Sequence, residues 1–218
     1  MPLCAVIAAL GTAPTLAADL TQPKTYRPYL EVFGGVDLLP GISASDNFFI
    51  APGSGKVNSK VGDFAGIAVG VELNNSWRVE AELARSYNGI QNFTYNNGNV
   101  NTYRGGGVNQ TYALANIWYD FHNQSAFVPY LGGGLGLGWA NGNLDLGGPN
   151  ISATAPAAFA FQVGAGVVYD FSDKFSIDLG YRFKAMPGIN PTVTPNFYSI
   201  DQKSIASHNF QIGAVLRF

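Results

Sequence analysis

Apolar and polar residues alternate with a period of two from Tyr29 onward, in stretches of about ten residues. Successive side chains of a β-strand point to opposite faces, so this period is typical of strands with one apolar face. A tilted strand needs about ten residues to cross a bilayer. The pattern predicts eight strands, Tyr29–Leu38, Phe64–Asn74, Trp77–Tyr87, Val108–Phe121, Phe127–Trp139, Ala157–Phe171, Phe175–Ala185 and Ala206–Phe218.

The connections between these strands alternate in length. The short ones are residues 74–76, 122–126 and 172–174, and the long ones are residues 39–63, 88–107, 140–156 and 186–205. In outer-membrane barrels short turns face the periplasm, long loops face outward, and an even strand number brings both chain ends to the periplasm. The long connections are rich in Gly, Asn, Ser, Thr and Pro, so we expect them to be mobile and to supply no core.

The last predicted strand has one apolar and one mostly polar face. Its apolar face consists of Phe210, Ile212, Ala214, Leu216 and Phe218, and the opposite face of Asn209, Gln211, Gly213, Val215 and Arg217. In a soluble barrel the apolar side chains would fill the interior, but they are too bulky for an eight-stranded lumen. We therefore expect the apolar face to contact lipid. The same parity places two basic residues outside, Arg85 and His208. Both lie at strand ends, where the free-energy cost of a charge beside lipid is small.

Charges of both signs fall on the inward face. We predict a lumen ion-pair cluster of Glu31, Glu72, Arg78, Glu80, Glu82, Asp178, Arg182 and Arg217, with Asp37 and Lys184 on the same face. Buried charges require partners, so these side chains are expected to pair and plug the lumen, the alternative being a transport path or catalytic site. The inward glycines of one strand, at positions 132, 134, 136 and 138, are expected to leave at most a small water-filled cavity.

Aromatic residues gather beside the short turns. They predict an aromatic girdle at the periplasmic membrane surface, because amphipathic rings favour the headgroup level. Its candidate members are Trp77, Tyr119, Phe121, Phe127, Tyr169, Phe171, Phe175 and Phe218.

The composition agrees with a chain that meets lipid through strands. Of the 218 residues 47% are hydrophobic and only 12% charged, which is unusual for a soluble surface. The mean hydropathy of +0.08 is too low for a helical membrane protein, and after residue 20 no apolar run is long enough for a spanning helix. A closed barrel is the remaining way to satisfy the backbone in lipid. The net charge of -2 gives no reason to expect nucleic acid.

The first residues predict export. Residues 1–18 have the apolar stretch and small residues of a signal peptide, the alternative being a buried N-terminal helix. We expect a short periplasmic segment at residues 19–28 and the barrel domain at residues 29–218. The single cysteine, Cys4, lies in the signal, so no disulfide or thiol chemistry is expected.

Chemical motifs are weak. The run Gly53–Lys56 lacks the remaining residues of a phosphate loop, and two histidines, His122 and His208, do not suggest a zinc site. His122 lies near Asp120 and Ser125, and His208 follows Ser207, but neither arrangement is specific for a catalytic triad. We expect no enzyme activity, no metal and no cofactor.

Several segments resemble a known family. The stretches Pro129–Gly134, Val163–Phe171 and Asp178–Phe183, together with the final Phe218, resemble the outer membrane protein β-barrel domain family of OmpA-like or opacity-type surface antigens, the "porin family". The resemblance implies an all-β, eight-stranded antiparallel up-and-down transmembrane β-barrel. It also implies recognition of Phe218 as an assembly signal by the outer-membrane assembly machinery.

The resulting hypothesis is an outer-membrane protein with a structural or surface-interaction role, such as envelope integrity, adhesion or host contact. Its expected partners are outer-membrane lipid, lipopolysaccharide, the assembly machinery and a host or surface ligand at the loops. Tyr95, Tyr103, Phe197 and Tyr198 either contact such a ligand or pack together. The alternatives are a narrow pore or small-solute transporter, a lipid-A-modifying barrel enzyme and a haem-binding surface protein.

Overall fold

A computed structural model describes residues 26–46, 53–73, 76–102, 105–145, 150–194, 198–200 and 203–218. The expected signal peptide lies outside the described residues, as does most of the expected periplasmic segment. The first described strand begins at Tyr26, three residues before the expected barrel boundary. None of the described residues forms a helix long and apolar enough to cross a membrane.

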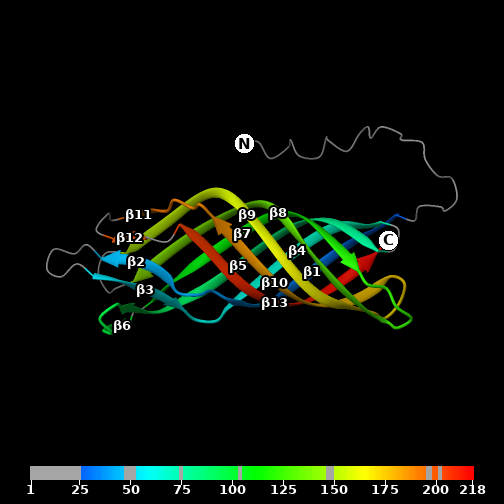
Figure 1. Ribbon diagram of the computed structural model, residues 1–218, viewed down its shortest axis with the longest axis horizontal. Coiled ribbons are helices and arrows are strands. Elements are labelled where there is room, and N and C mark those ends of the chain that lie inside the picture. The colour runs from blue at the N-terminus through cyan, green and yellow to red at the C-terminus, as the bar shows by residue number, and fades with distance from the viewer. Residues whose placement is uncertain are drawn as a thin grey trace.

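Eight long strands of the described chain form a closed antiparallel ring, which confirms the expected fold (Figure 1). Each ring strand pairs with the next one along the chain, and the first pairs with the last, so hydrogen bonds satisfy both edges of every ring strand. The ring strands are β1 (Tyr26–Leu38), β4 (Gly62–Leu73), β5 (Trp77–Tyr95), β7 (Gly105–Asp120), β8 (Phe127–Asp145), β9 (Ile151–Asp170), β10 (Phe175–Pro187) and β13 (Ser204–Arg217).

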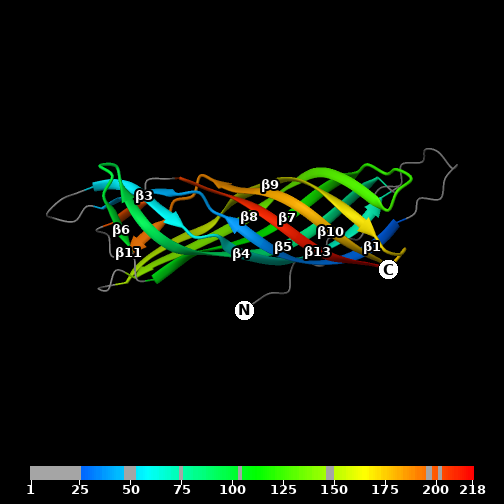
Figure 2. The same ribbon diagram turned by 90° about the horizontal axis from the view of Figure 1, so that it is seen from below.

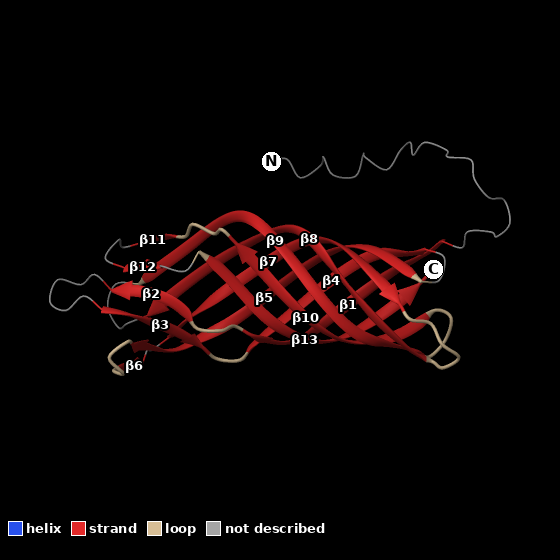
Figure 3. Cartoon of the chain, in the orientation of Figure 1, coloured by secondary structure: helices blue, strands red, loops and turns tan. Residues whose placement is uncertain are grey.

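The long connections carry short strands of their own, which gather at one end of the barrel, while the C-terminus lies at the other (Figures 1 and 3). β2 and β3 form a hairpin that pairs with β5, β12 pairs with β2, β6 pairs with β5, and β11 pairs with β9. We call these short strands and the adjoining ends of β5, β7, β8 and β9 the outer cap. The short strands are β2 (Ile42–Asp46), β3 (Gly53–Ser59), β6 (Val100–Thr102), β11 (Thr192–Thr194) and β12 (Tyr198–Ile200).

The expectation that the long connections supply no core is wrong. Ile42 and Val57 of the hairpin are buried together with Ile90 and Phe93, which lie on the extension of β5. This extension gives β5 a length of 19 residues. Single apolar residues at inward positions are enough to build this core, although the Gly, Asn and Ser residues around them hide the alternation in the sequence.

The outer surface of the barrel is apolar, as the parity predicted. Leu135, Phe210 and Ile212 are each about half exposed, whereas their neighbours in sequence face the interior. Aromatic rings beside the short turns contact one another in continuous rows, for example Trp77 with Tyr119 at 4.9 Å between ring centres. This arrangement fits an apolar band bordered by an aromatic girdle on a long, narrow barrel (Figure 2).

Candidate functional site

The interior of the barrel holds the charged residues that the parity placed there. Glu31, Glu80, Glu82, Asp178, Arg78, Arg182 and Arg217 are buried, and the Glu72 side chain is 12% exposed. The structure joins them into several groups, stacked along the barrel axis, instead of one cluster. The groups follow one another from the end with the short turns to the outer cap.

Arg217 closes the end with the short turns. Its Nε atom lies 2.5 Å from Glu72 Oε1, and its Nη1 atom lies 3.0 Å from Asp170 Oδ1 and also donates to the Ser176 hydroxyl. One guanidinium therefore ties together β4, β9, β10 and its own strand β13. Asp170 had not been expected in the cluster.

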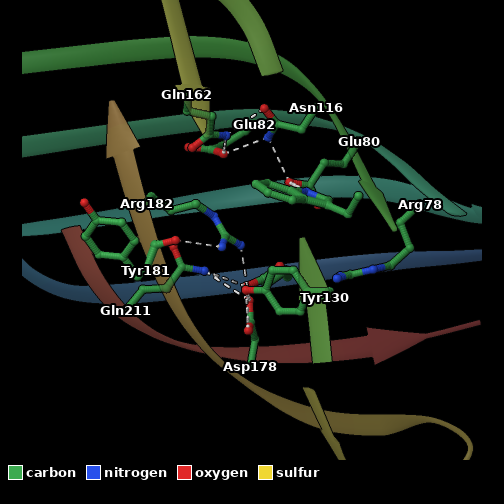
Figure 4. Close-up of polar contacts among 12 residues, drawn as sticks. Arg78, Glu80, Glu82, Asn116, Tyr130, Gln162, Asp178, Tyr181, Arg182 and Gln211 are labelled. Carbon is green, nitrogen blue, oxygen red and sulfur yellow. Dashed lines mark hydrogen bonds and ion pairs between the residues drawn. The ribbon is translucent and has the colours of Figure 1, made fainter. Parts of the chain in front are cut away.

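A layer that contains Arg182, Tyr130 and Asp178 lies deeper in the lumen (Figure 4). The Arg182 guanidinium carbon lies 4.1 Å from the ring centre of Trp118 and 5.0 Å from that of Tyr130. The Tyr130 hydroxyl donates to Asp178 at 2.7 Å, and Arg182 Nη2 lies 3.5 Å from the same carboxylate. Cation–π stacking and charged hydrogen bonds thus satisfy a guanidinium that water does not reach.

Arg78 approaches the same layer from β5. Its Nε atom donates to Asp120 at 2.8 Å, and its guanidinium carbon lies 4.8 Å from the ring centre of Tyr130. Tyr130 is therefore flanked by two guanidinium groups, those of Arg78 and Arg182. Asp120, like Asp170, is an ion-pair partner that had not been expected in the cluster.

Two of the expected ion-pair members use neutral partners. Glu80 accepts hydrogen bonds from the Tyr29 hydroxyl at 2.6 Å, the Trp118 indole at 2.8 Å and the Asn116 amide at 2.9 Å. Glu31 accepts one from the Gln211 amide at 3.4 Å. Among the described residues, no cation lies within ion-pair distance of either carboxylate. Neutral hydrogen-bond donors therefore contact these two carboxylates in place of the expected cations.

Glu82 and Lys184 form the next group. Their side chains make an ion pair across the lumen, and Glu82 also accepts hydrogen bonds from Asn116 at 2.8 Å and Gln162 at 2.6 Å. Gln162 in turn donates to Asn116 at 2.6 Å (Figure 4). Side chains from β5, β7, β9 and β10 meet here and occupy the centre of the barrel.

A polar layer and then an apolar one complete the filling toward the outer cap. Buried Asp37 accepts a hydrogen bond from Asn209 at 2.6 Å, and Tyr112 donates to Gln110 at 2.8 Å. Beyond this layer, buried Met186 belongs to the apolar cluster that continues into the outer cap.

The alternating glycines of β8 do not leave the expected water-filled space. A methyl group added at Gly132 would meet Trp118, one at Gly134 would meet Asn116, and one at Gly138 would meet Met186. Large side chains from neighbouring strands occupy the room that these glycines leave. The expectation overlooked these neutral residues, although the same parity places Trp118 and Asn116 on the inward face.

Among the residues that the structure describes, the expected candidates form no arrangement typical of a catalytic or metal site. In the described ranges, no three His, Cys, Asp or Glu side chains are grouped as metal ligands would be. His208 Nδ1 lies 2.7 Å from the Tyr181 hydroxyl on the lipid face, while neighbouring Ser207 is buried in the interior. The two residues therefore point to opposite sides of the barrel wall and form no nucleophile–base pair.

Comparison with known proteins agrees with the fold and the apolar band. The model of the family "Outer membrane protein beta-barrel domain" matches residues 3–218. The chain belongs to this family. It is an outer-membrane β-barrel protein, as the resemblance of its strand motifs implied.

The relatives include outer membrane protein PagN of Salmonella typhimurium, which is 30% identical over 123 residues. This match covers 51% of each chain, so the protein spans about half the length of that relative. Neisserial surface protein A is similar in structure, with a TM-score of 0.53 and 21% identity over 88% of this chain and 97% of that chain. Outer membrane protein OprG from Pseudomonas aeruginosa has a TM-score of 0.52 and 14% identity over 86% and 95%. These structural likenesses show the fold alone.

Proposed function

We propose that this protein is a non-catalytic surface-interaction protein, in which the barrel is a rigid anchor and the outer cap is the contact surface. The observation that carries the proposal is the filling of the lumen by interlocked side chains. Trp118 is fully buried there, and Tyr130 and Lys184 are 2% and 1% exposed. A pore for solutes needs a continuous path of water, which this packing does not offer.

The outer cap supports the second half of the proposal. Its strands extend the barrel wall beyond the ring and hold polar side chains in fixed places on the outside, including Lys56, Ser152 and Thr154, which are all exposed. A surface that is ordered before binding loses less conformational entropy when a partner docks. Hydrogen-bonded strands suit recognition of a host or surface ligand better than unpaired loops do.

The proposed partners follow from the apolar band and from the last residue, Phe218. Outer-membrane lipid and lipopolysaccharide would surround the apolar band, with Arg85 placed near its outer border. Phe218 would be recognised by the assembly machinery, because the residue is 72% exposed while its backbone nitrogen donates to the Pro28 carbonyl at 2.9 Å. We propose neither nucleic acid nor a cofactor as a partner.

Bacterial adhesion tests the proposal directly. A non-adherent Gram-negative strain that displays the protein is expected to bind cultured epithelial monolayers several-fold better than the same strain with an empty vector. A triple variant of the outer cap, Lys56→Glu with Ser152→Lys and Thr154→Lys, is expected to return binding to the vector level. Asn123→Ala, in a short turn at the opposite end, is the matched control. Equal binding by vector and protein-displaying cells, at verified surface levels, would overturn the proposal.

A further inference from the structure

The outer cap contains an apolar cavity of about 80 Å³. It lies between the β2–β3 hairpin and the outer ends of β5, β7, β8 and β9. Its walls are built mainly from aliphatic and aromatic side chains, among them Ile42, Val57, Ile90, Phe93, Val108 and Ile151. Neither the adhesion proposal nor the membership of the family assigns a ligand to this cavity.

The cavity lies on the water side of the lipid face. Along β5 the outward position of Leu83 is apolar, and the next outward position is the exposed Arg85. Ile90 and Phe93, which line the cavity, follow Arg85 by five and eight residues on the same strand. Each strand residue adds about 3.3 Å, so the cavity lies beyond the border of the apolar band. A molecule dissolved in water therefore reaches it more directly than a bilayer lipid does.

Apolar side chains continue from the cavity walls toward the interior of the barrel. Buried Leu114, Ala160 and Met186 belong to the same apolar cluster as the cavity walls. Water in a cavity of this kind lacks hydrogen-bond partners, and apolar cavities of comparable kind stay dry and accept apolar molecules. An apolar group gains burial there without displacing well-ordered water.

The rim of the cavity is polar. Asn143 is exposed and accepts a hydrogen bond from the Gly107 backbone nitrogen at 3.1 Å, and the hydroxyl-bearing residues Ser45 and Ser199 also line the cavity. An apolar interior behind a polar, water-facing rim suits a molecule with one apolar end and one polar end. The polar end can stay in water beside Asn143 while the apolar end is buried.

We infer that the cavity binds the end of one alkyl chain of a water-soluble, single-chain amphiphile such as a medium-chain fatty acid. The volume sets the number of chains, because a dry cavity of about 150 Å³ takes one benzene molecule. A space of about 80 Å³ takes the last few carbons of one chain and excludes a second chain. The remainder of the chain and its head extend past the rim.

Methyl NMR of the protein in nanodiscs, titrated with sodium decanoate, tests the inference. The isoleucine methyls of the cavity, in Ile42, Ile90, Ile151 and Ile200, are expected to shift and saturate together. Those of the lipid face, in Ile117 and Ile212, are expected to drift linearly as decanoate enters the bilayer. Equal, unsaturable drift at both sets would overturn the inference. Contacts between cavity methyls and nanodisc lipid chains before decanoate is added would also overturn it, in favour of a bilayer lipid as occupant.

Two filling variants from different strands provide the second arm. Ala44→Leu on β2 and Ala153→Leu on β9 each add bulk to the cavity wall and are expected to weaken decanoate binding at least tenfold. Ala81→Leu on the lipid face is the matched control and is expected to bind as the wild type does. Heat-modifiable migration on gels verifies that each variant is folded. Unchanged affinity in both folded filling variants would contradict the assignment.

Discussion

Lys184 of β10 forms an ion pair with Glu82 of β5 across the barrel lumen, 102 positions apart in the sequence. The two strands are not neighbours in the ring, so this pair connects opposite parts of the wall. Both side chains are almost completely buried, and Asn116 and Gln162 complete the hydrogen bonding of the carboxylate. The lumen is thus held together by side chains as well as surrounded by strands.

Removing the cation from this pair is expected to destabilise the barrel strongly. Lys184→Met leaves the Glu82 carboxylate buried without its ionic partner, and breaking a buried pair in this way costs about 3 to 5 kcal/mol. Urea unfolding in lipid vesicles, followed by tryptophan fluorescence, measures the change in the free energy of unfolding.

The double variant Lys184→Met with Glu82→Leu is the control for this prediction. It removes both charges, so most of the stability is expected to return, because replacing a whole buried pair by apolar groups is often neutral. A single variant as stable as the wild type would show that the pair does not hold the lumen together.

Two glycines on the inward face of β8 are expected to respond differently to substitution. A methyl group at Gly134 would collide with the Asn116 side chain and the Ala115 carbonyl, while one at Gly142 would have its nearest neighbours at 3.8 to 3.9 Å. Gly134→Ala is therefore expected to cost about 1 to 3 kcal/mol through overpacking, and Gly142→Ala close to nothing. The same unfolding assay checks both, and similar values for the two would contradict the tight packing beside Asn116.

The lipid face can be tested with a matched pair of arginines on one strand. Leu135 is 60% exposed in the apolar band, whereas Asn141 lies on the same strand and face, nearer the outer cap. Leu135→Arg is expected to cost about 2 to 4 kcal/mol and Asn141→Arg about 0 to 1 kcal/mol, because the cost of a charge depends on depth in the bilayer. The free energies of unfolding from vesicles provide the comparison, and a reversed order would mean that the band is placed wrongly.

Phe218 is expected to affect assembly more than stability. Phe218→Ala should lower the folded fraction in the outer membrane of growing cells, measured by heat-modifiable migration, while refolding of the purified variant into vesicles stays normal. Phe171→Ala, another exposed girdle aromatic, is the control and should assemble as the wild type does. Normal assembly of the Phe218 variant would contradict the proposal that Phe218 is an assembly signal.

The ring was predictable from the sequence because each spanning strand repeats one physical constraint. Lipid on one side and packed polar groups on the other force a strict alternation, as in Phe210 and Ile212 against Asn209 and Gln211. The outer cap could not be predicted from the sequence pattern, because no contact with lipid imposes alternation there. Ile90 and Phe93 are separated from other apolar residues by Gly, Gln and Asn, so their common burial depends on partners from distant strands.

The interior was predictable in composition but not in pairing. Parity placed Glu80 and Arg182 inside, yet the partners depend on the stagger between strands, which the sequence alone does not fix. Trp118 shows the consequence, because it donates to Glu80 and stacks under Arg182 although it carries no charge. A prediction limited to charged residues misses Trp118, whereas a prediction that covers every inward position includes Trp118.

Conductance across planar bilayers tests the central claim most directly, namely that packed side chains fill the lumen of this outer-membrane barrel. The purified wild-type protein, reconstituted and verified as folded, is expected to give no steady channels above the bilayer baseline. Steady channels of porin size would contradict the filled lumen, and with it the proposal that the protein acts through its outer cap.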